Sequence, residues 1–454
     1  MSVGETTDAS ALSDQVKRYK PRAFRQPSRG PAPLTVGGPK SADGAANAAH
    51  ERLTSKCISV IVDNFEDLPM HEHVPAKCVV PHIRAPRGVP LTHPSFRYMR
   101  EITSRLPANL DPNIAATYVF DENYWKRSCI ERFGWQNCQI AEHGLTWKQL
   151  FFETWLTDQL ESFDPHKTEF AALIASVKAC QDYVFALTAK QLLAHPDLEK
   201  VCEHLPNLTK LDITYGVKKI GMKYERMLFG MKISDANCLA RCVLNSPNLT
   251  TLVLASNLID DDLLRMLMTG LIKNSSITYL DVSHNKITNH GVRLLSKLLG
   301  SQSVLTSLSL ADNQIHAEGG RYLGRGLRSN ASLVDLNLRL NRLTDDGGRM
   351  LLEGIRSNRT LMRLNISANA LGTESAAAIA TVLQSPDAPL QTIDLSCNEF
   401  GNQDVCALAG ALAGNSTLTS VDMRMNEKIT EDLDELAAIQ AIAHKNELGF
   451  RNGQ

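Results

Sequence analysis

Histidine and cysteine side chains are the first candidates for chemistry in this chain, because their spacing decides whether a metal ion can bind. His71, His73 and His82 lie in one proline-rich stretch. A structural zinc site needs four ligands on a fixed scaffold, and this stretch offers neither a fourth ligand nor regular structure. Cys238 and Cys242 are four residues apart, with no second pair at zinc-site spacing. We therefore expect no metal or cofactor, and interpret the ten cysteines as reduced core residues.

Motifs for phosphate binding and catalysis are no better supported. Gly37-Gly-Pro-Lys-Ser resembles a phosphate-binding loop, but Pro39 replaces the glycine that must precede the lysine, and no strand comes before it. The sequence contains no G-x-S-x-G elbow, no H-E-x-x-H pair and no convincing nucleophile with a base. We expect a protein that is not an enzyme, whose polar side chains act as a binding surface.

A sequence motif that could position such a surface recurs every 28 or 29 residues. The phrase L-x-x-L-x-L-x-x-N-x-L begins at Leu249, Ile277, Leu305, Leu333, Leu361, Leu390 and Leu418. This is a leucine-rich repeat. The alternation in L-x-L predicts a short strand with leucines inward and their neighbours outward. We expect the asparagines to bond the backbone of adjacent turns rather than a ligand; they are Asn257, Asn285, Asn313, Asn341, Asn369, Asn398 and Asn426.

The second half of each repeat has helical spacing. Apolar residues recur at intervals of three and then four, as in Leu264, Leu267 and Leu271, which places them on one buried helix face. Glycine in the first of these columns, at Gly320 and Gly348, is expected to let helix and strand approach closely. The unit resembles the ribonuclease-inhibitor type of repeat. We predict an α/β solenoid with parallel strands on the concave face and helices on the convex face.

The domain organisation follows from where the repeats begin and end. We expect a disordered basic tail at 1–50, a mainly helical region with a Pro-rich loop at 51–205, and repeats at 206–430. An eighth copy begins at Leu208 and carries an aromatic insertion near 217–231. A C-terminal capping helix and tail should occupy 431–454.

The region before the repeats is expected to be a small helical core. Phe163 to Leu193 is expected to continue as helix. All four tryptophans lie between Trp125 and Trp155. We interpret these aromatics as a core that caps the solenoid, with a partner groove as the alternative.

Charge bounds the kinds of partner. The formal net charge is −1, which favours neither nucleic acid nor an anionic membrane. No stretch is apolar enough for a signal peptide or membrane span, so we expect a soluble protein of a reducing cytoplasmic compartment. Between Gln15 and Ala42, residues 1–50 of this chain contain a basic arm with no acidic residue. This arm either binds an acidic surface, such as the tail of tubulin, or is simply a solvated segment. The arm comprises Lys17, Arg18, Lys20, Arg22, Arg25, Arg29 and Lys40.

The outward strand positions identify the candidate binding face. Small polar residues dominate, with acids in the middle and arginines in the carboxy-terminal half. Our hypothesis is that a partner polypeptide with basic character docks here, with a merely solvated face as the alternative. The candidate residues are Asp281, Asp335, Arg339, Arg363, Asp394, Asp422 and Arg424.

Three phrases beyond the repeat pattern carry a family resemblance. They are Asp121-Glu-Asn-Tyr-Trp-Lys-Arg, Trp147-Lys-Gln-Leu-Phe-Phe-Glu and Leu211-Asp-Ile-Thr-Tyr-Gly-Val. Over roughly residues 95 to 430 the chain resembles the T-complex-associated testis-expressed leucine-rich-repeat proteins, subunits of the axonemal nexin–dynein regulatory complex. The resemblance implies a non-catalytic scaffold in the cytoskeleton of motile cilia and flagella, with other subunits of that complex as partners. The first ~90 residues take no part in it.

Two other functions are compatible with such repeats. One is an inhibitor or ubiquitin-ligase adaptor that uses residues 51–205 as its recruiting module. The other is a GTPase activator of the Ran class, which would assist hydrolysis with positioned polar groups. The chain ends in GFRNGQ, whereas a Ran-class activator would carry an acidic tail.

Overall fold

The computed structural model describes residues 54–65, 94–135, 138, 140, 146–216, 229–385, 388–430 and 433–452. The chain divides into two compact units between Gln139 and Ile140. None of the helices in these described ranges has the length and apolar character that crossing a bilayer requires.

The first unit is helical. It contains a helix at 54–63, α3 (Pro94–Arg105), α4 (Pro112–Tyr118) and α5 (Glu122–Phe133). Asp121 caps α5 by accepting a hydrogen bond from the backbone N–H of Asn123 at 2.9 Å. Trp125 is fully buried and donates its indole N–H to the carbonyl of Val119 at 2.9 Å. Trp135 is 74% exposed, so the expectation that all four tryptophans form one core is wrong for this residue.

The described residues of the second unit include a parallel sheet of nine strands in chain order. The strands are β1 (Ala186–Ala189), β2 (Lys210–Ile213), β3 (Thr251–Val253), β4 (Tyr279–Asp281), β5 (Ser307–Ser309), β6 (Asp335–Asn337), β7 (Arg363–Asn365), β8 (Thr392–Asp394) and β9 (Ser420–Asp422). Each residue pairs with its counterpart one repeat later, as Leu252 does with Leu280 and Leu280 with Leu308. This register places equivalent side chains in straight columns across the sheet.

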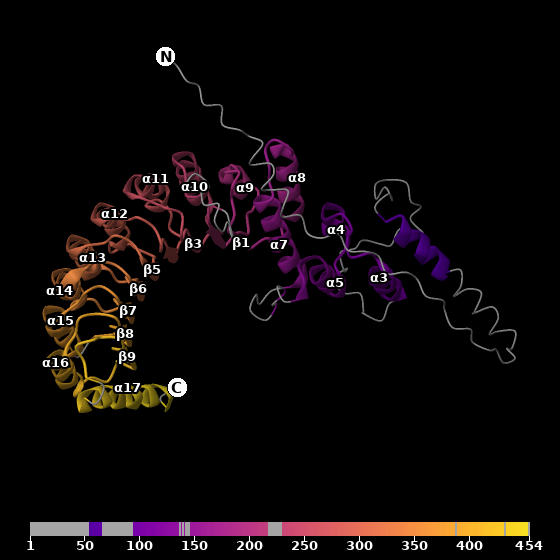
Figure 1. The fold of residues 1–454 in the computed structure, drawn as a ribbon. Coiled ribbons are helices and arrows are strands. Elements are labelled where there is room, and N and C mark those ends of the chain that lie inside the picture. The colour runs from indigo at the N-terminus through magenta and orange to yellow at the C-terminus, as the bar shows by residue number, and fades with distance from the viewer. Residues whose placement is uncertain are drawn as a thin grey trace, which may run out of the picture. The chain divides into compact units, whose positions relative to one another are not determined.

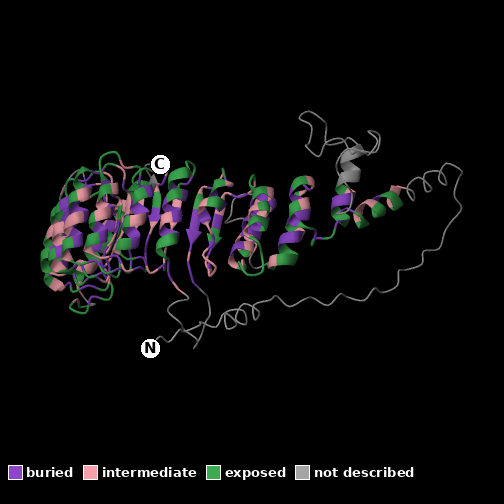
Figure 2. Cartoon of the chain, turned by 90° about the horizontal axis from the view of Figure 1, so that it is seen from above, coloured by how far each residue is buried: buried purple, intermediate pink, exposed green. Residues whose placement is uncertain are grey.

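Helices flank the sheet (Figure 1). They are α7 (Trp147–Glu161) and α8 (Phe170–Cys180) before the sheet, then α9 (Leu198–Glu203), α10 (Ile233–Asn245), α11 (Asp261–Leu271), α12 (Asn289–Leu295) with a 3₁₀ turn at Ser296–Leu299, α13 (Ala317–Ser329), α14 (Thr344–Ile355), α15 (Thr373–Leu383), α16 (Asn402–Leu412) and α17 (Asp434–Asn452). Those from α9 to α16 follow strands and cover the outer face of the curved ladder, and α7 and α17 pack against its first and last strands. The leucine-rich-repeat solenoid with concave strands and convex helices is therefore confirmed. Figure 2 shows the buried residues of this unit gathered between strands and helices, with exposed residues on the outer helix faces.

One secondary-structure expectation is wrong. The segment from Phe163 to Leu193 is not continuous helix, because α8 ends at Cys180 and β1 follows as the first strand of the sheet. The sequence Ala186-Leu-Thr-Ala lacks the repeat phrase, but its burial still alternates from Leu187 to Ala189. Residues 140–205, expected to belong with the N-terminal region, pack in the same compact unit as the repeats.

Side chains from two helices close the open edges of the sheet. Glu153 on α7 accepts hydrogen bonds from the backbone N–H groups of Phe185 and Ala186, each at 2.8 Å, at the β1 edge. At the other end, on α17, Gln440 donates to the carbonyl of Val421 at 3.0 Å and Asn446 to that of Leu418 at 2.9 Å. Both edge strands thus have partners for backbone groups that would otherwise be open to pairing.

Gly320 and Gly348 bring neighbouring helices together, not helix and strand. A Cβ on Gly320 would lie 2.4 Å from the carbonyl oxygen of Gly347 on α14. A Cβ on Gly348 would lie 2.4 Å from the hydroxyl of Ser375 on α15. The sequence correctly indicated close packing at these glycines but assigned the wrong neighbour. They lie against the next helix of the solenoid and not against a strand.

Candidate functional site: the concave face

Three outward positions per strand build the concave face, and a shared hydrogen bond fixes the middle one. Asp281, Asn337 and Asn365 each accept the backbone N–H of the residue two positions later, at 2.9–3.0 Å. Asp394 and Asp422 do the same. The bond holds the chain where it leaves the strand, as in an Asx turn. The acid column therefore has a structural role that the sequence hypothesis did not include.

Several of the predicted binding residues are already paired with one another. Arg363 Nε lies 2.8 Å from Asp335 Oδ2, across neighbouring strands. Arg424 Nε lies 3.0 Å from Asp422 Oδ1, and this hydrogen-bonded guanidinium holds the pKa of Asp422 below its usual range. Such exposed pairs contribute little to stability, so a partner can compete for them.

The other three predicted residues form no direct ion pair among the described residues, although the Asp394 carboxylate adds to the effect of Asp422 in raising the pKa of Arg424, just after the next strand. Asp281 uses only its Oδ1, to accept the Ser283 N–H. Asp394 accepts from Ser396 and from the Asn365 amide, at 2.9 Å, but from no cation. Arg339 is exposed and its guanidinium forms no hydrogen bond with any residue that the structure describes. These three charges are the ones most available to a partner.

A hollow of about 320 Å³ opens on this face across β4, β5 and β6. Asp281, Asp335, Arg339 and Tyr279 contribute to its lining, and small residues such as Ser309 line it between them. Tyr279 is 36% exposed. Its partial burial raises the pKa of its phenol, and the carboxylates of Asp281, Asp335 and Asp212 raise it further. The hollow thus combines the Tyr279 ring with two carboxylates and one arginine.

The sequence hypothesis missed one ion pair at the amino-terminal end of the face. Lys190, just after β1, forms an ion pair with Asp212 on β2, whose side chain is largely buried. Because Lys190 lies outside the repeat phrase, no column position pointed to it. This pair neutralises Asp212, so Asp281 is the first carboxylate of the central column without a cation.

The asparagine ladder is structural, as expected. Asn285 is 7% exposed, and its Oδ1 accepts the backbone N–H groups of Asn257 and Ile259 at 3.0 and 2.9 Å. Its amide donates to the carbonyls of Leu254, Val282 and Ser283 at 2.9–3.0 Å. The other six asparagines repeat the pattern and are equally buried. Every polar atom is used, which leaves none for a ligand.

A second set of polar side chains, which sequence reasoning missed, caps three of the described helices from the previous repeat. Asp261 accepts the backbone N–H groups of Thr288 and Gly291 at the start of α12. Asn289 accepts those of His316 and Gly319 at the start of α13. Asp345 does this for α15. A signal was present, since Asp261, Asn289 and Asp345 lie at multiples of 28 near the starts of their helices, although Ala317 interrupts the column.

Replacing Asp345 with asparagine should remove part of the acid sensitivity of folding. Burial raises the pKa of Asp345, but hydrogen bonds from Ser375, Glu374 and Gly372 outweigh it, so the net shift is downward. A lowered folded-state pKa contributes stability above the unfolded value of about 3.9, and this contribution is lost as pH falls through the folded-state pKa. Urea unfolding between pH 7 and 3 should show a shallower loss below pH about 4 for Asp345→Asn than for wild type. Equal slopes would contradict the assignment.

The N-x-S/T triplets within the repeats also have a structural explanation. Asn358 is 2% exposed, and its Oδ1 accepts the backbone N–H groups of Thr360 and Leu361 at 2.9 and 2.8 Å. Its amide donates to the carbonyls of Leu327 and Asn330. Asn330 and Asn415 hold the same turn in their repeats. These asparagines shape the turn from helix to strand.

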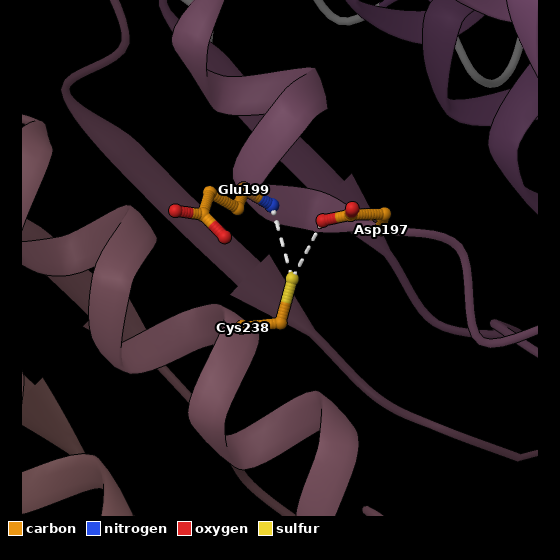
Figure 3. A group of neighbouring side chains, drawn as sticks. All are labelled: Asp197, Glu199 and Cys238. Atoms are coloured by element: carbon orange, nitrogen blue, oxygen red, sulfur yellow. Dashed lines mark hydrogen bonds between the residues drawn. The ribbon is translucent and has the colours of Figure 1, made fainter.

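Among the residues that the structure describes, one group of side chains has the spacing of metal ligands: Asp197, Glu199 and Cys238 (Figure 3). The Cys238 thiol donates to Asp197 Oδ1 at 2.8 Å and accepts the backbone N–H of Glu199 at 3.3 Å. Glu199 is bound by Arg241 at 2.6 Å. Burial, together with the hydrogen bond to Asp197, raises the pKa of the Cys238 thiol to about 12. The group joins α9 to α10 by hydrogen bonds and needs no metal.

The cysteines are not all core residues. Cys129, Cys180, Cys202, Cys238 and Cys242 are buried free thiols, but Cys57, Cys397 and Cys406 are exposed. The interpretation of all ten as core residues is wrong for these three. Cys397 precedes a ladder asparagine, at a position with positive φ that must face away from the core.

Three expectations lie outside the described residues. They concern the basic arm (Lys17, Arg18, Lys20, Arg22, Arg25, Arg29), the histidines at 71, 73 and 82, and the main part of the insertion near 217–231. They stay predictions.

The ladder defines the class of protein: the chain is a leucine-rich-repeat protein. A family model described as Leucine Rich repeat matches residues 273–296, 301–324, 329–352 and 357–380. An internalin from Listeria monocytogenes covers 58% of this chain and 74% of its own, at 16% identity and a TM-score of 0.33, too low to carry an argument. The fold assignment stands on the chain's own strand order.

The particular relatives share one name. Dynein regulatory complex subunit 5 of Chlamydomonas reinhardtii is 39% identical over 215 residues, 47% of this chain and 50% of that protein. The Mus musculus and Homo sapiens proteins of the same name are 30% identical over 253 and 248 residues, covering 50% and 48% of this chain and 46% and 45% of theirs. The resemblance found in the sequence is therefore confirmed. The chain spans about half the length of the curated relatives it matches.

Proposed function

We propose that this chain is a non-catalytic structural subunit of the dynein regulatory complex in the axoneme of motile cilia and flagella. It binds other subunits of the complex through its repeat surface and so helps to regulate dynein-driven motility. The observation that carries the proposal is the 39% identity with a subunit of that complex over 215 residues. No observation favours the ubiquitin-ligase adaptor, the inhibitor or the Ran-class GTPase activator.

The concave face is the proposed contact with the other subunits. Its support is a ladder of nine strands whose outward columns carry charges of both signs. Interfaces of this kind depend on complementary charge for partner choice and register. The basic arm would supply a second contact, with the acidic surface of doublet microtubules.

The test uses the tagged full chain in a flagellated cell that lacks its own copy. Wild type should stay with salt-washed doublets and co-precipitate other subunits of the complex. Asp394→Lys with Asp422→Lys reverses two charges of the face and should lower the recovery of at least one subunit by about tenfold or more, as expected for like charges brought together. Quantitative mass spectrometry of the precipitate measures both.

A matched control separates the face from net charge. Asp262→Lys with Glu353→Lys adds the same charge on exposed convex positions and should leave recovery unchanged. Asp394→Asn with Asp422→Asn keeps the Oδ1 acceptor that Asn365 provides in the same column. If the tagged wild-type chain did not stay with salt-washed doublets, the proposed location in the axoneme would be refuted. Full recovery of the other subunits by the variant with both aspartates changed to lysine would show that the concave face is not the contact.

A further inference from the structure

The unpartnered charges of the concave face alternate in sign along the ladder. Asp281 lies on β4, Arg339 follows β6 and Asp394 lies on β8, so the order is negative, positive, negative at intervals of two strands. Neighbouring strands are about 4.8 Å apart, which makes each interval roughly 10 Å. Lys190 already neutralises Asp212, so the carboxylates of the pattern begin at β4, and the charge before them is the exposed Lys210 on β2, in the column of Tyr279.

An α-helix has the same interval on one face. Residues seven apart lie on the same side of a helix and are about 10.5 Å apart along its axis. A helix laid along the ladder can therefore place a charge against every second strand. Because the sequence negative, positive, negative is symmetric, either direction of the helix fits.

The hollow across β4–β6 provides space for such a helix, and it provides a binding position for one residue of the helix at the β4 end. Ser307, Ser309 and Ala311 contribute only small side chains to it, so a helix can come close to the strands. Tyr279 exposes part of its ring beside Asp281. A guanidinium fits this pair, because it stacks on an aromatic face and binds a carboxylate through two donors.

We propose that the concave face from β4 to β8 seats one α-helix of a partner subunit, with an arginine over Tyr279 and Asp281, an acidic residue at Arg339 seven residues on, and a basic residue at Asp394 after seven more. The inference rests on the proposed function and adds the chemistry of the partner. It excludes an acidic tubulin tail from the β4 end of the face.

The probes are two stapled helical peptides of 21 residues that differ only in charge order. One carries arginine, glutamate and arginine at heptad spacing, and the other carries glutamate, arginine and glutamate at the same positions. Fluorescence anisotropy with the full chain should show the first binding at least about tenfold more tightly, because the second places like charges together. Moving the glutamate of the first peptide from seven to five residues after the first arginine should lower its affinity by about three- to tenfold, since two residues correspond to about 200° of helical rotation and that side chain then faces away from Arg339.

Charge exchange tests the register. Asp281→Arg should weaken the first peptide by about tenfold or more, and replacing that peptide's first arginine with glutamate should restore binding to within about threefold. Tyr279→Ala should weaken binding by about three- to fivefold, and Tyr279→Phe should keep it, as expected for stacking on a ring. Asp262→Arg on α11 is the matched control and should change nothing.

Asp281→Asn guards against a folding defect, because asparagine keeps the acceptor for the Ser283 N–H and occupies this column at Asn337 and Asn365. It should also weaken the first peptide. Equal affinity for the two charge orders, or an Asp281→Arg variant that the exchanged peptide does not rescue, would overturn the proposal. Retention on salt-washed doublets is measured separately. The proposal of a helix-binding site can therefore be refuted while the proposed membership of the complex still holds.

Discussion

Replacing Asn285 with alanine should lower the free energy of unfolding by about 3–5 kcal/mol. The change removes five hydrogen bonds at once and leaves the buried N–H groups of Asn257 and Ile259 without an acceptor. Each unsatisfied buried group costs about 1–3 kcal/mol. Urea unfolding followed by circular dichroism at 222 nm measures the loss.

Two companion variants identify the cause. Asn285→Asp keeps an acceptor but turns a second oxygen toward three carbonyls, so it should be no more stable than Asn285→Ala. Asn337→Ala removes a single bond at a half-exposed position and should cost less than about 1 kcal/mol. A loss of that small size for Asn285→Ala would show that the ladder does not hold the turns together.

The second large effect is expected at Gly354 on α14. A Cβ there would lie 2.1 Å from the carbonyl oxygen of Gly324 and 2.4 Å from two more of its backbone atoms. Only separation of α13 from α14 relieves that contact, because no flexible side chain is involved. Gly354→Ala should therefore destabilise the protein by about 3 kcal/mol, at the upper end of the range for overpacking.

Gly410→Ala is the matched control, because Gly410 is also inside a helix and its added Cβ would meet nothing within 4 Å. Alanine is the better helix former, so this variant should gain about 1 kcal/mol. Thermal unfolding of the two variants should move in opposite directions. A gain in both would mean that the two helices are not in close contact.

The sequence predicted the frame of the solenoid well, because one physical unit is repeated. The leucine columns fixed which side chains are buried, and the asparagine phrase fixed a buried bonding pattern that any single repeat would have left ambiguous. The outward columns placed Asp335 and Arg363 on the same face. Their ion pair also follows from the register, since they are 28 residues apart in one column.

The sequence predicted less where the phrase is absent or where the partner comes from another repeat. The strand β1 was expected to be helix, because Ala186-Leu-Thr-Ala carries none of the repeat pattern and its edge is completed by Glu153 from a distant helix. The glycines of α13 and α14 were assigned the wrong partner. Helical spacing shows that one face of a helix carries small residues, but it does not show which element packs against that face. The pairing of Lys190 with Asp212 depends on a residue outside the repeats, and column reasoning could not reach it.

The caps at the two ends of the sheet have a consequence for assembly. Glu153 occupies the N–H groups at the β1 edge, and Gln440 and Asn446 occupy carbonyls at the other. These bonds disfavour the joining of two copies end to end by strand addition, and with it the growth of the ladder into a filament. If the chain is a subunit of an axonemal complex, as proposed, its position along a repeating lattice would then be set by its neighbours and not by self-assembly.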